Sequence, residues 1–271
     1  MKPAPFDYVR AETLAEVHDV LAAEEDAAAV IAGGQSLVPL LSMRMARPSV
    51  VLDIMHVAEL GGIRLEGGAI RVGATVRQAE LLAWPELAAR QPLLAQALPW
   101  VGHWQTRARG TVCGSMALAD PSAELPLLLA ALGGSIALSS KSGCRSVKAN
   151  NFFTGLMSTA RNDDELIESV SFPCQRSGEG FAFREFARRH GDFAIVACAA
   201  VATEKNVRLT VGGVADRPMV RDFDEASEDA LAAFAESLEA RDDLHATAEY
   251  RRMLVCELGR QTMAEARACR A

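Results

Sequence analysis

The N-terminal part of the chain alternates short apolar runs with segments of helical periodicity. Apolar residues recur at helical spacing over residues 12–28, where Thr13 is an N-cap candidate with capping-box spacing. Compact apolar runs at 28–32 and 50–54 predict two strands, and residues 37–45 between them predict a short helix. Two glycines directly follow the first strand. The segment therefore reads as strand, glycine turn, helix and strand, which is the usual frame of a phosphate site.

The middle of the chain predicts a hairpin, then helices and further strands. Apolar and polar residues alternate on both sides of the turn Glu66-Gly67-Gly68, as they do in an antiparallel hairpin. Residues 173–180 are polar and rich in turn formers, which indicates a domain boundary. Between these two turns the pattern predicts helices at 76–82 and 86–98 and strands at 135–138 and 166–172.

The C-terminal part begins with strands and ends in helices. Strand patterns occupy residues 181–186, 194–202 and 207–211, and from about Glu225 the sequence is helical and acidic. We therefore expect an α+β protein. Its expected domains are residues 1–176 and a small C-terminal domain of residues 177–271.

Composition and charge narrow the class of protein. With 271 residues, 50% hydrophobic and 23% charged, the chain can bury a core of ordinary size. A formal net charge of -7 provides no basic field for a nucleic-acid backbone, so we do not expect nucleic acid as a partner. The N-terminus lacks the apolar run of a signal peptide, and the apolar stretch 125–138 is too short and glycine-interrupted to span a bilayer. We expect a cytoplasmic protein.

The cysteines are too far apart in sequence to suggest a metal or cluster site. The chain contains 6 of them, and none belongs to a Cys-x-x-Cys pair of the kind that binds zinc or iron–sulfur clusters or carries out dithiol chemistry. We therefore expect no metal site on this chain. Any electrons that the protein handles must be carried by another group.

The glycine turn after the first strand is the first candidate for chemistry. Glycines accept positive φ and carry no Cβ, so a phosphate can approach the backbone N–H groups of Gly33 and Gly34, with Ser36 as an added hydroxyl donor. By itself, a glycine pair behind a strand is more often a plain turn. A second phosphate-type turn at residues 111–115 strengthens the hypothesis, because a dinucleotide has two phosphates and two ends to be held.

The known nucleotide motifs are absent. The sequence contains no Gly-x-Gly-x-x-Gly, no Walker A motif and no Gly-x-Ser-x-Gly. A nucleotide would therefore be held by an architecture other than the Rossmann fold or the P-loop.

Several stretches resemble the medium, FAD-binding subunit of molybdenum hydroxylases, the family of the carbon monoxide dehydrogenase and xanthine dehydrogenase flavin subunits. The densest is Ala32-Gly33-Gly34-Gln35-Ser36-Leu37 with the residues that follow it. Others occur in the family's order and cover nearly the whole chain: residues 105–115, Ala119-Asp120-Pro121, Phe152-Phe153-Thr154-Gly155, Asp164-Glu165-Leu166-Ile167, residues 187–194 and Ala248-Glu249-Tyr250-Arg251-Arg252.

The resemblance implies a fold and a set of FAD-binding residues. The fold would be the vanillyl-alcohol-oxidase (PCMH) type, with two α/β subdomains, about residues 1–56 and 57–176, that hold the flavin between them, followed by a small domain of antiparallel strands and helices. No catalytic residue is implied on this chain. The implied cofactor-binding residues are Ala32, Gly33, Gly34, Gln35, Ser36 and Leu37 at the pyrophosphate; Thr111, Val112, Cys113, Gly114 and Ser115 near the phosphate and ribityl chain; Asp120; Glu124 at flavin-chain hydroxyls; Leu166 and Ile167 in the flavin or adenine pocket; and Arg184 near the ring.

Three of these residues have plainer readings. Arg184 suits a solvated charge on an edge strand, Asp120 a helix N-cap beside Pro121, and Glu124 a surface carboxylate. The sequence alone does not decide between the two readings.

The second turn also departs from the family pattern. Cys113 stands where the family has glycine, and strain would follow if that position needed positive φ. Ala108 replaces the usual Asn, and Glu124 replaces an Asp.

The resemblance further implies an electron-transfer role. The chain would bind FAD within a heterotrimer, alongside a small [2Fe-2S] subunit and a large molybdopterin subunit, and we expect a dimer of such heterotrimers. It would take electrons from the clusters and pass them from FAD to an external acceptor. Two alternatives remain open: a self-sufficient flavin oxidoreductase of the same fold, and a non-catalytic module whose flavin site has decayed.

Overall fold

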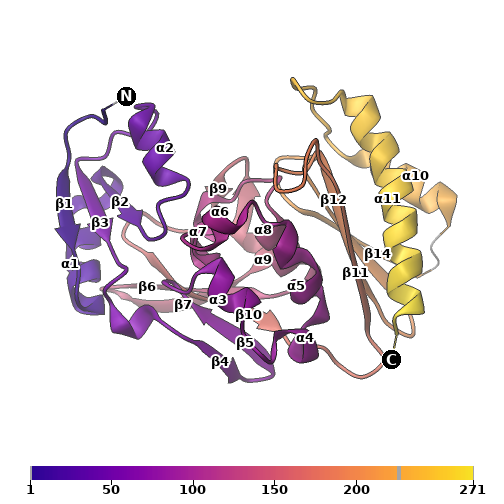
Figure 1. Ribbon diagram of the computed structural model, residues 1–271, viewed down its shortest axis with the longest axis horizontal. Helices are drawn as coiled ribbons and strands as arrows, with labels where there is room; N and C mark the ends of the chain where they lie inside the picture. The colour runs from indigo at the N-terminus through magenta and orange to yellow at the C-terminus, as the bar shows by residue number, and fades with distance from the viewer. Residues whose placement is uncertain (1, 225–226, 271) are drawn as a thin grey trace.

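The computed structural model describes residues 2–224 and 227–270, and it arranges them as three lobes in a row (Figure 1). The N-terminal lobe, indigo in the figure, lies at one end and the orange and yellow C-terminal lobe at the other. The expected helical start at Glu225 lies outside the described residues.

The N-terminal lobe is a three-stranded parallel sheet with helices packed beside it. Its strand order is β1-β3-β2, so the expected strand, turn, helix and strand unit is present, and an additional edge strand pairs with β3. That edge strand was not predicted because it is short and polar at both ends. The elements are β1 (Asp7–Arg10), α1 (Leu14–Glu24), β2 (Ala28–Ile31), α2 (Leu37–Ser42) and β3 (Val50–Asp53).

Helix α1 begins where its capping box predicts. The Thr13 hydroxyl accepts a hydrogen bond from the Glu16 amide at 3.2 Å, and the Glu16 carboxylate accepts one from the Thr13 amide at 3.4 Å. Val17 and Leu21 bury the inner face of the helix. The helix ends at Glu24, earlier than expected, and a 3-10 turn (Glu25–Ala27) leads into β2.

The central lobe is a five-stranded antiparallel sheet in the order β4-β5-β10-β6-β7. The helix expected over 86–98 is split into α4, α5 and a 3-10 turn (Leu98–Trp100), because Pro92 is the first residue of one new helical segment and Pro99 the second residue of the next. The elements are β4 (Ile63–Glu66), β5 (Ala69–Gly73), α3 (Gln78–Leu82), α4 (Leu87–Arg90), α5 (Pro92–Ala97), α6 (Trp104–Arg107), α7 (Val112–Leu118), α8 (Glu124–Leu132), β6 (Ser135–Ser140), β7 (Gly143–Lys148), α9 (Ala149–Phe152), β8 (Phe153–Gly155), β9 (Ser158–Thr159) and β10 (Leu166–Pro173).

Helix α8 is apolar all round because it is covered on two sides. It contacts β10 of the central sheet as well as strands of the C-terminal lobe, and almost every side chain along it is buried. The apolar stretch at 125–138 is thus an internal packing element followed by a strand.

The C-terminal lobe is a four-stranded antiparallel sheet in the order β11-β12-β13-β14. Helices α10 and α11 cover its outer side, and α8 packs against the inner side (Figure 1). Strand β12 is rich in alanine and almost completely buried, as a central strand covered on both faces requires. The elements are β11 (Gly180–Phe186), β12 (Val196–Ala202), β13 (Val207–Gly212), β14 (Met219–Phe223), α10 (Glu228–Ser237) and α11 (Ala248–Ala268).

A buried arginine ties α11 to the sheet. Arg251 is 5% exposed and donates hydrogen bonds to the carbonyls of Ile195 at 2.6 Å and Gly213 at 2.7 Å, while it also pairs with Asp243. These two carbonyls belong to the loops that enter β12 and leave β13. Arg251, quoted above as part of a family-like stretch, therefore has a structural role.

Replacing Arg251 with Leu should lower the free energy of unfolding by about 2–4 kcal/mol, because two buried carbonyls lose their donor. Urea denaturation of the full chain measures the change. The control is Arg260→Leu on the same helix, whose pair with Glu257 is exposed to solvent and contributes little to stability. Equal losses from the two variants would contradict the role given to Arg251.

Candidate functional site

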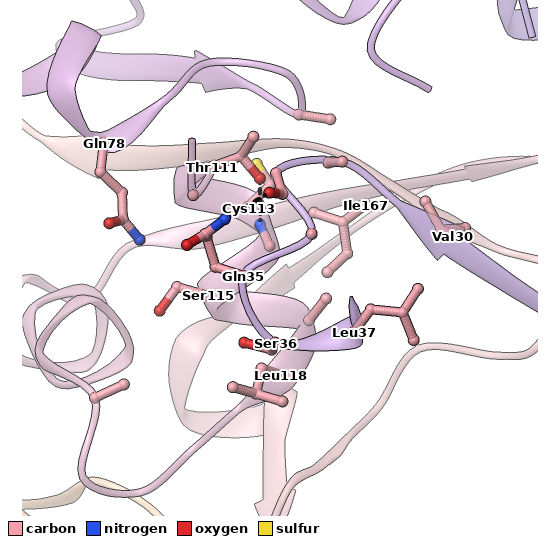
Figure 2. A pocket seen from close by; sticks show the side chains of 18 of the residues that line it. Val30, Gln35, Ser36, Leu37, Gln78, Thr111, Cys113, Ser115, Leu118 and Ile167 are labelled. Carbon is pink, nitrogen blue, oxygen red and sulfur yellow. Dashed lines mark hydrogen bonds between the residues drawn. The ribbon is translucent and has the colours of Figure 1, made fainter. Parts of the chain in front are cut away.

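A cleft of about 640 Å³ collects residues from all three lobes (Figure 2). Its walls come from β2 and the turn behind it, from the turn that begins α7, from the start of β10, and from the loop between β11 and β12. Thirteen of the residues implied by the family resemblance line it: Ala32, Gly33, Gly34, Gln35, Ser36, Leu37, Thr111, Cys113, Gly114, Ser115, Glu124, Leu166 and Ile167.

The first turn is built for close backbone approach. A Cβ added at Gly33 would lie 2.1 Å from the carbonyl oxygen of Arg109, so only glycine lets the first turn touch the segment that leads into the second turn. Gly34 has a φ of 70°, which turns the chain out of β2. Ser36 stands at the N-cap of α2 without a capping hydrogen bond from its side chain. Its hydroxyl is therefore available to a ligand.

The second turn is held by its own cap. The hydroxyl of Thr111, the N-cap of α7, accepts a hydrogen bond from the Gly114 amide at 3.0 Å. Val112 lies in the first turn of α7 with its side chain fully buried in the core, and it does not line the cleft.

Cys113 is not strained, which corrects the concern raised by the sequence. It lies inside α7 with helical backbone and is absent from the residues of positive φ. Its Sγ lies 3.7 Å from the carbonyl oxygen of Val72, toward the core. Burial raises the pKa of this thiol to about 12, so the sulfur stays protonated and unreactive at neutral pH.

Glu124 is a buried acid at the cleft wall, so the reading as a surface carboxylate is wrong. It is the first residue of α8 and is 3% exposed. Burial raises its pKa to about 7, and the charge of Asp120 adds to the shift. Near neutral pH this carboxyl can therefore be either a hydrogen-bond donor or an acceptor.

Glu185 is a half-buried residue whose carboxylate lies near enough to that of Glu124 for the two charges to interact. Both of its carboxylate oxygens are buried without a hydrogen-bond partner among the described residues. Burial and then the charge of Glu124 raise its pKa to about 8. The two acids disfavour each other's ionisation.

The structure does not bring Arg184 to the cleft. Successive side chains of a strand point to opposite faces, and Arg184 lies on the face of β11 that packs against α11, where it pairs with Glu265 at 2.9 Å. Arg184 therefore does not lie where the resemblance implied, near the flavin ring. It is a partly solvated charge on an edge strand. Glu185, one residue along, occupies the opposite face.

Asp120 also lies outside the cleft lining, and it is not a helix N-cap. Its Oδ1 accepts a hydrogen bond from the Ser122 amide at 2.8 Å, which closes a local turn two residues before α8. The N-cap of α8 is Ala123. The side chain of Asp120 thus shapes the approach to α8.

Several cleft residues escaped the sequence interpretation. Glu165 and Phe193 belong to family-like stretches but were given no role, whereas Gln78 stands in an ordinary helical pattern that gives no signal of function. Phe193 is 60% exposed although it lines the cleft. Others include Val30, Gly102, Thr106, Gly110, Arg161, Gly191 and Asp192.

Comparison with known proteins identifies the family. Residues 4–175 match the FAD binding domain in molybdopterin dehydrogenase, and residues 181–266 match the CO dehydrogenase flavoprotein C-terminal domain. The chain belongs to the FAD-binding medium subunits of the molybdenum hydroxylases. One relative is the nicotine 6-hydroxylase medium subunit of Paenarthrobacter nicotinovorans. It is 37% identical to this chain over 98% of this chain and 99% of the relative. Another is the carbon monoxide dehydrogenase medium chain of Afipia carboxidovorans, 31% identical over 99% of each.

Solved structures confirm the fold. Reconstituted CO dehydrogenase from Oligotropha carboxidovorans superposes with a TM-score of 0.93 at 30% identity, over 100% of both chains. Quinoline 2-oxidoreductase from Pseudomonas putida 86 gives a TM-score of 0.90 at 34% identity, over 99% of both. The expected FAD-binding α+β fold with a C-terminal domain of antiparallel strands is thus confirmed.

No group of three or more His, Cys, Asp or Glu side chains among the described residues is arranged to hold a metal ion. None of the helices within residues 2–224 and 227–270 is both long and apolar enough to cross a membrane.

Replacing Gly33 with Ala should weaken FAD binding by at least about tenfold, because the new Cβ cannot fit beside the Arg109 carbonyl and the turns must separate. Titration with FAD, followed by flavin fluorescence, measures the change. The control is Gly61→Ala, where a Cβ meets only ordinary contacts at 3.4 Å or more, and circular dichroism checks that both variants fold. Equal affinity in the two folded variants would refute the contact's importance.

The paired acids predict a pH dependence of stability. The pKa values of Glu124 and Glu185 in the folded protein, about 7 and about 8, lie above the value of about 4.5 for an unfolded chain. The stabilisation of the folded state by their protonated forms is therefore complete below pH about 4.5 and is lost as the pH rises through 7 to 8. Glu185→Gln should therefore flatten the fall in melting temperature between about pH 5 and pH 9. The exposed Glu257→Gln is the control. A wild-type melting temperature that rises over this window would contradict the assignment.

Proposed function

We propose that this chain is the FAD-binding electron-transfer subunit of a heterotrimeric molybdenum hydroxylase, with FAD in the cleft and its pyrophosphate between the two glycine turns. The single observation that supports this best is the direct contact between Gly33 and the Arg109 carbonyl, which places both turns at one cleft. A ligand with two phosphates suits two adjacent turns, of which the first offers the backbone N–H groups of Gly34 and Gln35.

The cleft residues suit the parts of FAD. Backbone N–H groups of Gly34 and Gln35, with the free hydroxyl of Ser36, would hold phosphate oxygens. Leu166 and Ile167 supply an apolar wall, and Glu124 can exchange a hydrogen bond with a hydroxyl of the flavin chain in either protonation state. FAD, when bound, supplies the redox centre that takes up and releases electrons.

Phe193 brings the C-terminal lobe to the same site. Its ring is an exposed apolar surface on the cleft wall, beside Gly191 and Asp192. A planar aromatic ligand would cover this ring and exclude water from it. We propose that residues 1–176 bind most of the cofactor and that residues 177–271 complete the site from one side.

The partners follow from the family. The names of the relatives, such as medium subunit and medium chain, describe parts of multi-subunit enzymes. We infer a small subunit with [2Fe-2S] clusters, a large subunit with the molybdopterin cofactor, and a cytoplasmic dimer of these heterotrimers. The chain would relay electrons from the clusters to an external acceptor.

Electron transfer through this chain can be tested on the assembled complex. The complex is reduced with dithionite and mixed with an oxidised dye, and the rate of dye reduction is compared with that of a complex that carries Gly33→Ala and has lost its flavin. We expect the variant to assemble with reducible clusters but to reduce the dye at least about tenfold more slowly, because a missing relay raises the barrier. Undiminished dye reduction without flavin would refute the relay. Substrate turnover by the isolated wild-type chain would instead favour a self-sufficient oxidoreductase.

A further inference from the structure

Arg161 is the one cationic side chain among the described residues that line the cleft. Three carboxylates line it as well, those of Glu124, Glu165 and Asp192. FAD carries negative charge on its phosphates and acceptor nitrogens on its rings, and a guanidinium can donate to either kind of group. Arg161 is therefore a candidate for recognition of the ligand.

One nitrogen of this guanidinium is held by the protein. The Nη1 of Arg161 donates to the carbonyls of Asn162 at 2.9 Å, Asp163 at 3.3 Å and Glu165 at 2.7 Å. All three carbonyls belong to the loop between β9 and β10. The orientation of the side chain is thus set before a ligand arrives.

The other two nitrogens of the guanidinium are free. Nε and Nη2 form no hydrogen bond with the described residues, and neither is among the polar atoms that are sealed from solvent. Glu165 does not neutralise Arg161 by an ion pair, because its two oxygens accept from Arg145 at 2.5 Å and 2.7 Å. The charge and two N–H-bearing nitrogens of Arg161 are therefore available to a ligand.

The loop that carries Arg161 lies at the end of the cleft next to the N-terminal lobe. Leu166, which follows the loop, pairs with Ser139 of β6. The Ser139 hydroxyl in turn lies 3.0 Å from Nε2 of His18, on α1 of the N-terminal lobe. Residues 28–30 of β2 line the cleft from that lobe.

The flavin ring suits the opposite end of the cleft. Phe193, an exposed aromatic residue of the lining, belongs to the C-terminal lobe, and Glu124 begins α8, which packs against that lobe. With the pyrophosphate between the two turns, an extended FAD places its adenine at the N-terminal end. Figure 2 shows Val30 and Ile167 there, on the side of the second turn away from Gln78.

The N-terminal end of the cleft has the composition of an adenine site. The side chains of residues 28–30, Leu40 and Ile167 are apolar and suit the faces of a ring. The edge of adenine carries acceptor nitrogens, which need a donor when the ring leaves water. Arg161 supplies that donor from the loop beside Ile167.

We propose that Arg161 recognises the adenine end of the cofactor, with the free N–H groups of its guanidinium donating to acceptor nitrogens of the ring. This rests on the proposed function, that FAD binds in this cleft. Arg161 then makes the site select a dinucleotide over the flavin mononucleotide, because only the dinucleotide carries adenine.

The test compares Arg161→Met with Arg107→Met in the full chain. Arg107 is a matched control, because its Nη1 also donates to three carbonyls, those of Pro99 at 3.2 Å, Val101 at 2.9 Å and Gly102 at 2.8 Å, although its side chain does not line the cleft. Dissociation constants are measured for FAD, FMN, ADP and inorganic pyrophosphate, and melting temperatures are measured without ligand.

We expect Arg161→Met to weaken FAD and ADP about tenfold and to leave FMN and pyrophosphate within about twofold, because only the first two ligands carry adenine. Both variants should lower the melting temperature, since each removes support from a loop, but Arg107→Met should leave the affinity for ADP unchanged.

Three results would overturn the proposal: an unchanged ratio of FAD to FMN affinity in Arg161→Met, a loss of pyrophosphate affinity as large as that of ADP, or an equal loss of ADP affinity in Arg107→Met. The second result would place the cation at the phosphates, and the third would reduce Arg161 to a support of its loop. Failure of the proposed function itself would appear separately, as wild-type protein that binds no FAD.

Discussion

The structure of the site depends on one backbone contact, the approach of Gly33 to the Arg109 carbonyl. Any side chain at position 33 would fill the space in which the first turn meets the segment before the second. Because each turn comes from a different lobe, this contact sets the position of the N-terminal parallel sheet against the central antiparallel sheet. The shape of the cleft between the two sheets therefore depends on this contact.

The C-terminal lobe is part of the same construction. Helix α8 is buried between the central sheet and the C-terminal sheet, so its first residue, Glu124, is carried into the cleft wall in a low-dielectric environment. The two-residue period of β11 then places Glu185 on the inner face and Arg184 on the outer face. A packing arrangement thus produces two coupled acids, whose raised pKa values follow from burial.

Local chemistry explains what could be predicted from the sequence. The glycine turns, the Thr13 capping box and the apolar runs each carry their signal within a few residues, and the cleft gathers most of the residues expected there. The roles of Arg184 and Asp120 depend on which way each side chain faces in the folded chain, and no local sequence pattern determines that direction. Cys113 looked strained only because its helical backbone was not visible from the sequence. The short strands β1, β7 and β14 are too polar to stand out without their neighbours.

The central claim is that one dinucleotide is held by both glycine turns at once. Amide hydrogen–deuterium exchange of the full chain with and without FAD tests it most directly, because backbone N–H groups that bind phosphate exchange more slowly. We expect FAD to slow exchange in residues 33–36 and 111–115 together, and to leave the distant Gly67-Gly68 turn unchanged. Saturating FAD that protects only one of the two turns, or neither, would contradict the account.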